Sequence, residues 1–331
     1  MEASTVLTLR EPPSISLDSV LSARETIAGR LHRTPTFSSA TLSELTGARV
    51  HLKAELFQRT GSFKPRGVLN KLAALSAEER ARGVIGISAG NHAQALAYGA
   101  REAGLSVLVV MWADANPAKI AAARAYGAEI DLAAPGPAEA FDRLAELIAE
   151  TGRTLVHPFD DPLVIAGQGT VGLEIVEDVP EVDLVVVPVG GGGLISGVAT
   201  AVKGLRPQAR IVAVEPELSP ALHEGLKAGR PVPVQPRSVA DGLGAPFAGD
   251  HAVRVCSALG VESILVSEED IEDGFRFVYQ RAKLACEPAG AAATGALLAG
   301  KVAVSQGETV AVVVSGGNAA PETASAILAP R

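Results

Sequence analysis

The feature that most constrains the fold is a repeated alternation of short apolar runs with helical patterns. The runs Val84–Ser88 and Leu105–Met111 are each followed by a helical segment, and the same alternation resumes at Leu184–Val189 and Ile211–Glu215. These runs are continuously apolar, which is typical of parallel strands that are buried on both faces. The sequence therefore predicts an α/β protein with open, twisted, mainly parallel sheets and helices on both faces.

The flanking elements follow from apolar spacing and turn residues. A first helix is expected at about Asp18–Arg30 and a strand at Ala48–Leu56. Two further helices are expected at 269–284 and 288–299. The segment Gly229–Asp250 is rich in proline and glycine, so we expect an irregular loop there.

Composition excludes several classes of protein. The chain has 331 residues, of which 47% are hydrophobic, and a formal net charge of −8. This hydrophobic content excludes general disorder, and the length suggests two domains. The acidic balance argues against a general nucleic-acid clamp, so we expect no nucleic-acid partner.

The cysteine content and the N-terminus bear on the compartment. Cys256 and Cys286 are the only two cysteines, too few for a disulfide framework and without the spacing of a zinc site. The first residues lack the basic start and apolar stretch of a signal peptide, and no apolar run is long enough to span a membrane. We therefore expect a soluble protein in the reducing cytoplasm, with no membrane partner.

A run of four glycines, Gly190, Gly191, Gly192 and Gly193, joins an apolar strand to a helix. Glycines there let backbone N–H groups converge on an anion at the positive end of the helix, so a phosphate site is predicted. A tight turn without a ligand is the plainer alternative. A nicotinamide dehydrogenase is a further alternative, because Glu215 closes the next strand, but Ser196 stands where the dinucleotide fingerprint needs glycine or alanine.

The sharpest candidate for catalysis is Lys64, in the sequence Ser62-Phe63-Lys64-Pro65-Arg66-Gly67. The lysine lies between a glycine-containing turn and a helix that begins with proline, which holds it in place. A partly desolvated amine can lose its proton and attack a carbonyl carbon. Taken alone, a lysine is more often a solvated surface charge.

Two other strand ends carry polar groups. Ser88-Ala89-Gly90-Asn91-His92 opens a helix, where backbone N–H groups, the Ser88 hydroxyl and the Asn91 amide can hold a carboxylate, or else cap the helix. His92 is also compatible with a purely structural role. Ser315 follows the last strand and can donate to a ring nitrogen or cap a turn, and Glu287 stands at a helix start, where capping is the plainer explanation.

Taken together and in this order, these motifs resemble the fold-type II pyridoxal-phosphate enzymes, whose fold is that of the tryptophan synthase β subunit. Within them the likeness is to threonine/serine dehydratases, which are ammonia-lyases, and it covers about residues 20 to 325. The motifs that carry it are Ser62–Gly67, Ser88–Gln94, His157–Thr170, Gly190–Gly193 and Ser315–Asn318. The resemblance implies a large cofactor-binding domain of residues 1–68 and 156–331, a small α/β domain of residues 69–155, and no C-terminal regulatory domain.

The resemblance also implies roles for the site residues. Lys64 is then the Schiff-base lysine and takes the Cα proton. The implied contacts of pyridoxal 5'-phosphate are Phe63, Lys64, Asn91, Gly190, Gly191, Gly192, Gly193, Gly242, Glu287 and Ser315. The implied substrate contacts are Ser88, Ala89, Gly90, Asn91, His92 and Asp241.

The implied activity is β-elimination of water from L-threonine or L-serine, which gives 2-oxobutanoate or pyruvate and ammonia. Lyases for 3-hydroxyaspartate or phenylserine look alike at these motifs and stay open as alternatives. Serine racemases of similar sequence have a second acid/base serine at the position of Ala89, so racemisation is expected to be at most a side reaction. Relatives that bind a divalent cation carry a second acid at the position of Ala221, so no metal is expected to be required.

By the same resemblance the protein is a homodimer or a homotetramer. The lack of a regulatory domain implies a degradative or otherwise unregulated enzyme.

Overall fold

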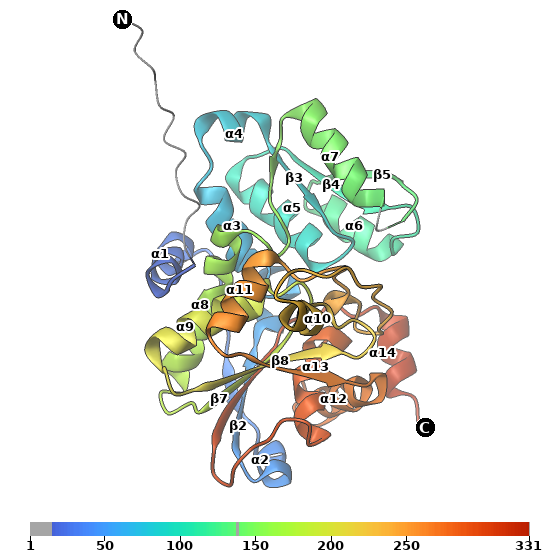
Figure 1. The fold of residues 1–331 in the computed structure, drawn as a ribbon. Coiled ribbons are helices and arrows are strands. Elements are labelled where there is room, and N and C mark those ends of the chain that lie inside the picture. The colour runs from blue at the N-terminus through green and yellow to red at the C-terminus, as the bar shows by residue number, and fades with distance from the viewer. Residues whose placement is uncertain (1–14, 137–138, 331) are drawn as a thin grey trace, which may run out of the picture.

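The computed structural model describes residues 15–136 and 139–330, and its strands form two separate sheets (Figure 1). The larger sheet has the strand order β1-β2-β10-β7-β8-β9, in which only β1 is antiparallel to its neighbour. Its strands are β1 (Thr36–Ser38), β2 (Arg49–Ala54), β7 (Leu184–Pro188), β8 (Arg210–Pro216), β9 (Glu262–Val266) and β10 (Thr309–Val314).

The smaller sheet is entirely parallel and has the order β5-β4-β3-β6. Its strands are β3 (Val84–Ile87), β4 (Val107–Trp112), β5 (Glu129–Ala134) and β6 (Thr154–Leu155). Side chains of β3 and β4 pack into two different cores, so helices cover both faces of this sheet. The helices in this part are α4 (Ala77–Arg82), α5 (Asn91–Ala103), α6 (Pro117–Ala125) and α7 (Glu139–Thr151).

Helices also cover both faces of the larger sheet, and β7 shows why its sequence is continuously apolar. Leu184 and Val186 pack into one core, whereas Val185 and Val187 pack into the core on the opposite face. The first core lies against α12 and α13, and the second lies against α8 and α9. The helices in this part are α1 (Leu17–Ile27), α2 (Ala40–Thr46), α3 (Pro65–Ala73), α8 (Pro162–Asp178), α9 (Gly193–Leu205), α10 (Ala221–Ala228), α11 (Asp250–Ala258), α12 (Glu268–Gln280), α13 (Pro288–Leu298) and α14 (Pro321–Leu328).

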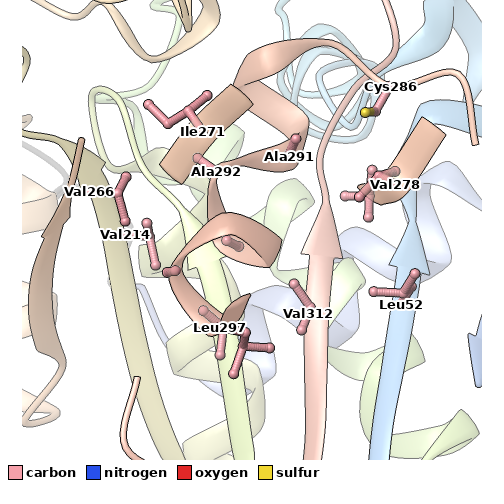
Figure 2. Close-up of a cluster of buried hydrophobic side chains, with 14 of the residues drawn as sticks. Leu52, Val214, Val266, Ile271, Val278, Cys286, Ala291, Ala292, Leu297 and Val312 are labelled. Carbon is pink, nitrogen blue, oxygen red and sulfur yellow. The ribbon is translucent and has the colours of Figure 1, made fainter. Parts of the chain in front are cut away.

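Small residues bring the helices of the first core close to each other and to the sheet. Figure 2 shows Ala291 and Ala292 of α13 above the strand residues Val214 and Val312. A Cβ atom on Gly295 of α13 would lie 2.2 Å from the Asp270 carbonyl oxygen of α12. Such a contact is too short for any side chain, so this helix pair packs backbone to backbone.

The predicted α/β class with two mainly parallel sheets is confirmed, but several element boundaries were wrong. The strand predicted to run to Leu56 ends at Ala54, where the chain turns into a 3-10 helix, η1 (Glu55–Phe57). The helix predicted at 269–284 ends at Gln280, and Lys283 has a left-handed φ of 60°. The helix expected to run to Arg30 ends at Ile27.

The proline- and glycine-rich segment is irregular, as expected, apart from the short 3-10 helix η3 (Asp241–Leu243). All strands of the smaller sheet fall within the predicted small domain, 69–155, although the exact division into domains stays a prediction. Both cysteines are buried and free. In the described part of the chain, no helix is long and apolar enough to cross a membrane.

Candidate active site

The candidate site lies where three neighbouring strands of the larger sheet end. In the order β2-β10-β7 each strand is parallel to the next, so their carboxyl ends meet at one edge. The chain beyond β2 leads to Lys64, the chain beyond β10 begins with Ser315, and the chain beyond β7 leads into Gly190–Gly193. The topology therefore brings together three motifs that are far apart in the sequence.

The loop that carries Lys64 is held against the loop that carries Ser315. The Phe63 amide donates to the Ser315 carbonyl oxygen at 3.2 Å, and Ser62 forms an antiparallel bridge with Gly316. The loop turns through Thr60, which has a positive φ of 62°. The helix α3 then begins at Pro65, so Lys64 occupies the N-cap position at the start of a rigid element.

The amine of Lys64 points into the site and has a lowered pKa. Its Nζ donates to the Pro158 carbonyl oxygen at 2.8 Å and lies 5.1 Å from the centre of the Phe63 ring. Burial lowers the pKa of Lys64 to about 8, and the Glu287 carboxylate opposes that shift. A substantial fraction of the amine is therefore neutral, and nucleophilic, slightly above neutral pH.

The glycine loop wraps closely around neighbouring atoms. A Cβ atom on Gly191 would lie 2.3 Å from a ring carbon of Phe159, and one on Gly193 would lie 2.7 Å from the Phe159 carbonyl oxygen. Gly192 has a φ of +90°, a conformation that other residues rarely adopt. The loop leads directly into α9, whose first N–H groups have no acceptor within the helix.

The second sheet contributes the N-terminus of α5, directly after β3. The Gly90 amide donates to the Ser88 hydroxyl at 3.0 Å, which shapes the turn before the helix. The side-chain nitrogen Nδ2 of Asn91 donates to the Glu287 carboxylate at 2.7 Å. The side-chain oxygen Oδ1 of Asn91 accepts from Nδ2 of Asn318 at 2.7 Å. These contacts tie the two sheets together across the site.

Glu287 is nearly fully buried at the start of α13. Burial raises its pKa to about 7, while the hydrogen bond from Asn91 lowers it. Burial thus shifts both groups toward their neutral forms, because it raises the pKa of Glu287 and lowers the pKa of Lys64.

The surrounding cavity is lined by all ten residues predicted to contact a cofactor. They are Phe63, Lys64, Asn91, Gly190, Gly191, Gly192, Gly193, Gly242, Glu287 and Ser315.

Comparison with known proteins identifies the family to which this chain belongs. A model of a family described as "Pyridoxal-phosphate dependent enzyme" matches residues 27–316. The chain belongs to the pyridoxal-phosphate dependent enzymes.

Individual relatives agree with this family. The chain is 44% identical to the L-threonine ammonia-lyase of Thermotoga maritima over 305 residues, which are 92% of this chain and 76% of the relative. The solved structure of a T.th. threonine deaminase is similar with a TM-score of 0.86 and 41% identity, over 92% of this chain and 99% of that one. The structure of maize serine racemase has a TM-score of 0.89 and 35% identity, over 94% of this chain and 96% of that one.

The residues present fit the cofactor of this family. The glycine loop leaves no room for a Cβ atom at Gly191 or Gly193, so only glycine allows the backbone to turn there and direct N–H groups toward an anion at the start of α9. Lys64, Asn91 and Ser315 supply an amine, an amide and a hydroxyl to the same cavity. In this pyridoxal-phosphate dependent enzyme the glycine loop would therefore hold the phosphate, and Lys64 would hold the aldehyde carbon.

The predicted substrate residues fall into three groups. Ser88, Ala89 and Gly90 are partly buried at the turn before α5, and Asn91, the first residue of that helix, lines the cavity. The His92 ring is buried in the core and lies 2.8 Å through Nε2 from the Val156 carbonyl oxygen, so its backbone is the part that faces the turn. Asp241 lies in η3 and pairs with Lys119.

Several residues of this site were not predicted from the sequence, and three of them bear on its chemistry. Phe159 lines the cavity against the glycine loop, Asn318 orients Asn91, and the ammonium of Lys119 lies beside Gly90. Phe159 and Asn318 belong to the motifs His157–Thr170 and Ser315–Asn318, which carry the family resemblance, and membership of these motifs is a usable signal. Lys119 lies within an ordinary helical pattern and gave no such signal.

The buried carboxylate of Glu215 has a structural role in this enzyme. Its two oxygens accept from the Leu222 and His223 amides at 2.7 and 2.8 Å, which caps α10. Within residues 15–136 and 139–330, no group of three or more His, Cys, Asp or Glu side chains is arranged to hold a metal ion.

Proposed function

We propose that this protein is a pyridoxal-phosphate dependent threonine/serine ammonia-lyase. It eliminates water from L-threonine or L-serine and yields 2-oxobutanoate or pyruvate together with ammonia. The observation that carries the proposal is the position of the Lys64 amine, where the Lys64 loop, the Ser315 loop and the glycine loop meet, with its pKa lowered to about 8 by burial.

Lys64 and Ser315 have separate roles in this reaction. When bound, pyridoxal phosphate supplies an electron sink for the charge that develops at the substrate Cα. Lys64 in its neutral form takes the Cα proton, which a base with a pKa near the working pH does efficiently. Ser315 would hold the ring nitrogen with a neutral hydroxyl, which favours rapid elimination over a long-lived carbanion.

The substrate carboxylate is placed at the N-terminus of α5. Backbone N–H groups and the helix dipole favour an anion there, and Ser88 already shapes the turn through its bond with the Gly90 amide. Ala89 stands in this turn, and its methyl group carries no proton to deliver to the opposite face of Cα. This arrangement supports elimination over racemisation.

The test is a kinetic panel on the purified holoenzyme. L-threonine, L-serine, 3-hydroxyaspartate and phenylserine are each assayed for 2-oxo acid, and L-serine is also assayed for D-serine. We expect turnover of L-threonine or L-serine to exceed that of the other two substrates. Faster turnover of 3-hydroxyaspartate or phenylserine would reassign the substrate, and D-serine as the main product would reassign the reaction.

The role of Lys64 is tested by K64A. The variant should lose about 1,000-fold or more in kcat because it lacks the amine that takes the Cα proton. The matched control is K227A, since Lys227 is an exposed lysine on α10 and should leave turnover unchanged. Full turnover by K64A would disprove the mechanism.

Assembly and location complete the proposal. The family likeness supports a homodimer or a homotetramer, and two buried free cysteines suit a reducing cytoplasm. Sedimentation of the purified protein measures its assembly.

A further inference from the structure

The strongest unassigned feature of the site is Lys119 on α6. Its Nζ forms an ion pair with the Asp241 carboxylate of η3, so it links the smaller-sheet part of the chain to the irregular segment of the larger part. The same Nζ lies 4.0 Å from the position that a Cβ atom on Gly90 would take. Among the described residues, and leaving out the two neighbours of Gly90 in the chain, no other heavy atom lies within 4 Å of that position. A positive charge therefore stands directly over the turn that is placed to hold the substrate carboxylate.

The two partners of this ion pair differ in exposure. The Lys119 side chain is 20% exposed, whereas the Asp241 side chain is 61% exposed. An ion pair with so exposed a carboxylate contributes little to stability, and Asp241 regains its hydration readily when the pair opens. The ammonium is therefore able to leave Asp241 for a better-shielded anion.

The turn before α5 offers such an anion once substrate is present. A carboxylate at the N–H groups of Gly90 and its neighbours lies within reach of Lys119, because the lysine stem is flexible and its ammonium has three donors. Asp241 and Lys119 are both close enough to the site to act on Glu287: the Asp241 carboxylate raises the pKa of the buried Glu287, and the Lys119 ammonium lowers it.

We propose that Lys119 is a substrate-binding residue that exchanges the carboxylate of Asp241 for the α-carboxylate of the substrate. Asp241 holds the ammonium at the mouth of the site until the substrate arrives. This inference rests on the proposed function and adds to it the cation that the neutral N–H groups of the turn lack.

The test compares four variants of the holoenzyme: K119M, K119R, D241N and the double variant K119M/D241N. A lost charge-assisted hydrogen bond predicts that K119M raises the KM for L-threonine by about 10- to 100-fold, with a much smaller change in kcat. K119R should restore KM to within about 5-fold, because it keeps the charge. D241N should lower KM by up to about 3-fold, because it removes the carboxylate that competes with the substrate for the Lys119 ammonium.

The asymmetry between K119M and D241N decides between this role and a merely structural tie. If the ion pair only held two segments together, both single variants would have the same effect, and the double variant would be no worse than either. Equal effects of K119M and D241N would thus overturn the inference.

A binding measurement gives a second, independent readout. L-2-aminobutanoate lacks the β-hydroxyl and cannot eliminate water, and its carboxamide lacks the charge of the carboxylate. Calorimetric titration of the holoenzyme should show that the preference for the carboxylate over the carboxamide falls about 10-fold or more in K119M and is unchanged in D241N. An unchanged preference in K119M would also overturn the inference.

These outcomes separate the two proposals. A holoenzyme that turns over none of the hydroxy amino acids disproves the proposed function, while the titration still tests Lys119. A holoenzyme that is active, but in which K119M and D241N behave alike, disproves the Lys119 proposal alone.

Discussion

Arg66, which follows Lys64 by two residues, forms a buried ion pair with Glu55 through two hydrogen bonds. Arg66 Nε donates to Glu55 Oε2 at 2.8 Å, and Nη2 donates to Oε1 at 2.7 Å. Both side chains are almost completely excluded from solvent. The guanidinium also donates to the Glu174 carboxylate at 2.7 and 2.9 Å and to the Thr170 hydroxyl at 3.1 Å. It therefore joins the start of α3 to η1 and α8.

Replacement of Arg66 by methionine should destabilise the protein severely. R66M keeps much of the side-chain volume but leaves the buried carboxylates of Glu55 and Glu174 without their main counter-charge. Breaking a buried pair in this way costs about 3–5 kcal/mol. Urea unfolding measures the loss. We expect K64A to be far less affected, because the Lys64 amine donates to an uncharged carbonyl oxygen, that of Pro158.

The matched control for R66M is R143M. Arg143 also pairs with two carboxylates, those of Asp131 and Glu146, but this site is more exposed. Its loss should cost much less stability than the loss of Arg66, because solvent screens an exposed pair. Equal costs for the two variants would show that the buried network contributes no more than an ordinary surface pair.

Much of this fold could be predicted from local patterns. The side chains on the two faces of β7 pack into two different cores. Every residue of the strand is therefore apolar, which the sequence shows as an uninterrupted apolar run. The end of β2 could not be predicted in the same way. Glu55 leaves the strand to meet Arg66, which is a partner that only the folded chain brings near.

The same limit applies to the site. The loops at Lys64, Gly190 and Ser315 are visible in the sequence because each follows a strand and has a distinctive composition. The Lys119–Asp241 pair is not visible, since it joins segments 122 residues apart through the approach of α6 to η3. Burial is equally hidden: His92 belongs to a site-like motif, yet its ring is enclosed in the core.

The glycine loop gives a second prediction. G192A places a side chain at a φ of +90° and its Cβ atom 2.4 Å from the Cβ of Ala252. We expect the dissociation constant of pyridoxal phosphate to rise at least about 10-fold because the loop must shift away from the phosphate position. Fluorescence titration of the apoprotein measures this constant.

G229A is the control for the backbone strain alone. Gly229 also has a positive φ, of 66°, but a Cβ atom there meets nothing within 4 Å. Both variants should lose about 1–2 kcal/mol of stability from the strained backbone, and only G192A should lose cofactor affinity. Equal cofactor affinities in the two variants would contradict the phosphate assignment.

Glu215 gives a prediction on pH. Burial raises its pKa to about 8, above the ordinary value of 4.5, although the Leu222 and His223 amides oppose the shift. Between these two values the folded protein binds a proton that the unfolded chain has released, so its contribution to stability falls as the pH rises from about 4.5 to 8. E215Q does not titrate, so its stability relative to the original protein should improve by about 2–4 kcal/mol between pH 5 and pH 8.5.

The comparison for E215Q is E322Q, at an exposed position of α14. Urea unfolding at the two pH values should show no such gain for E322Q. If the difference in the free energy of unfolding between E215Q and the original protein were the same at both pH values, the Glu215 carboxylate would be ionised throughout this range.

Lys64 also gives a prediction on pH, and the sign of its effect on stability is opposite to that of Glu215. Burial lowers the pKa of Lys64 from 10.5 to about 8, so between these values the unfolded chain holds a proton that the folded protein lacks. The contribution of Lys64 to stability therefore rises with pH from about 8 to 10.5, and below pH 8 it is fully unfavourable. K64M in the apoprotein should accordingly be more stable than the original apoprotein at pH 7, by about 1–3 kcal/mol, and should lose that advantage near pH 10.5.

The same amine should control how fast the apoprotein captures pyridoxal phosphate, because only the neutral form attacks the aldehyde. The capture rate, followed by absorbance, should rise with pH to a plateau with a midpoint near 8. E287Q removes the carboxylate that favours the charged amine, so this midpoint should move to lower pH. A midpoint that stays in place in E287Q, or lies near 10.5 in the original protein, would show that the buried site does not lower the pKa of Lys64.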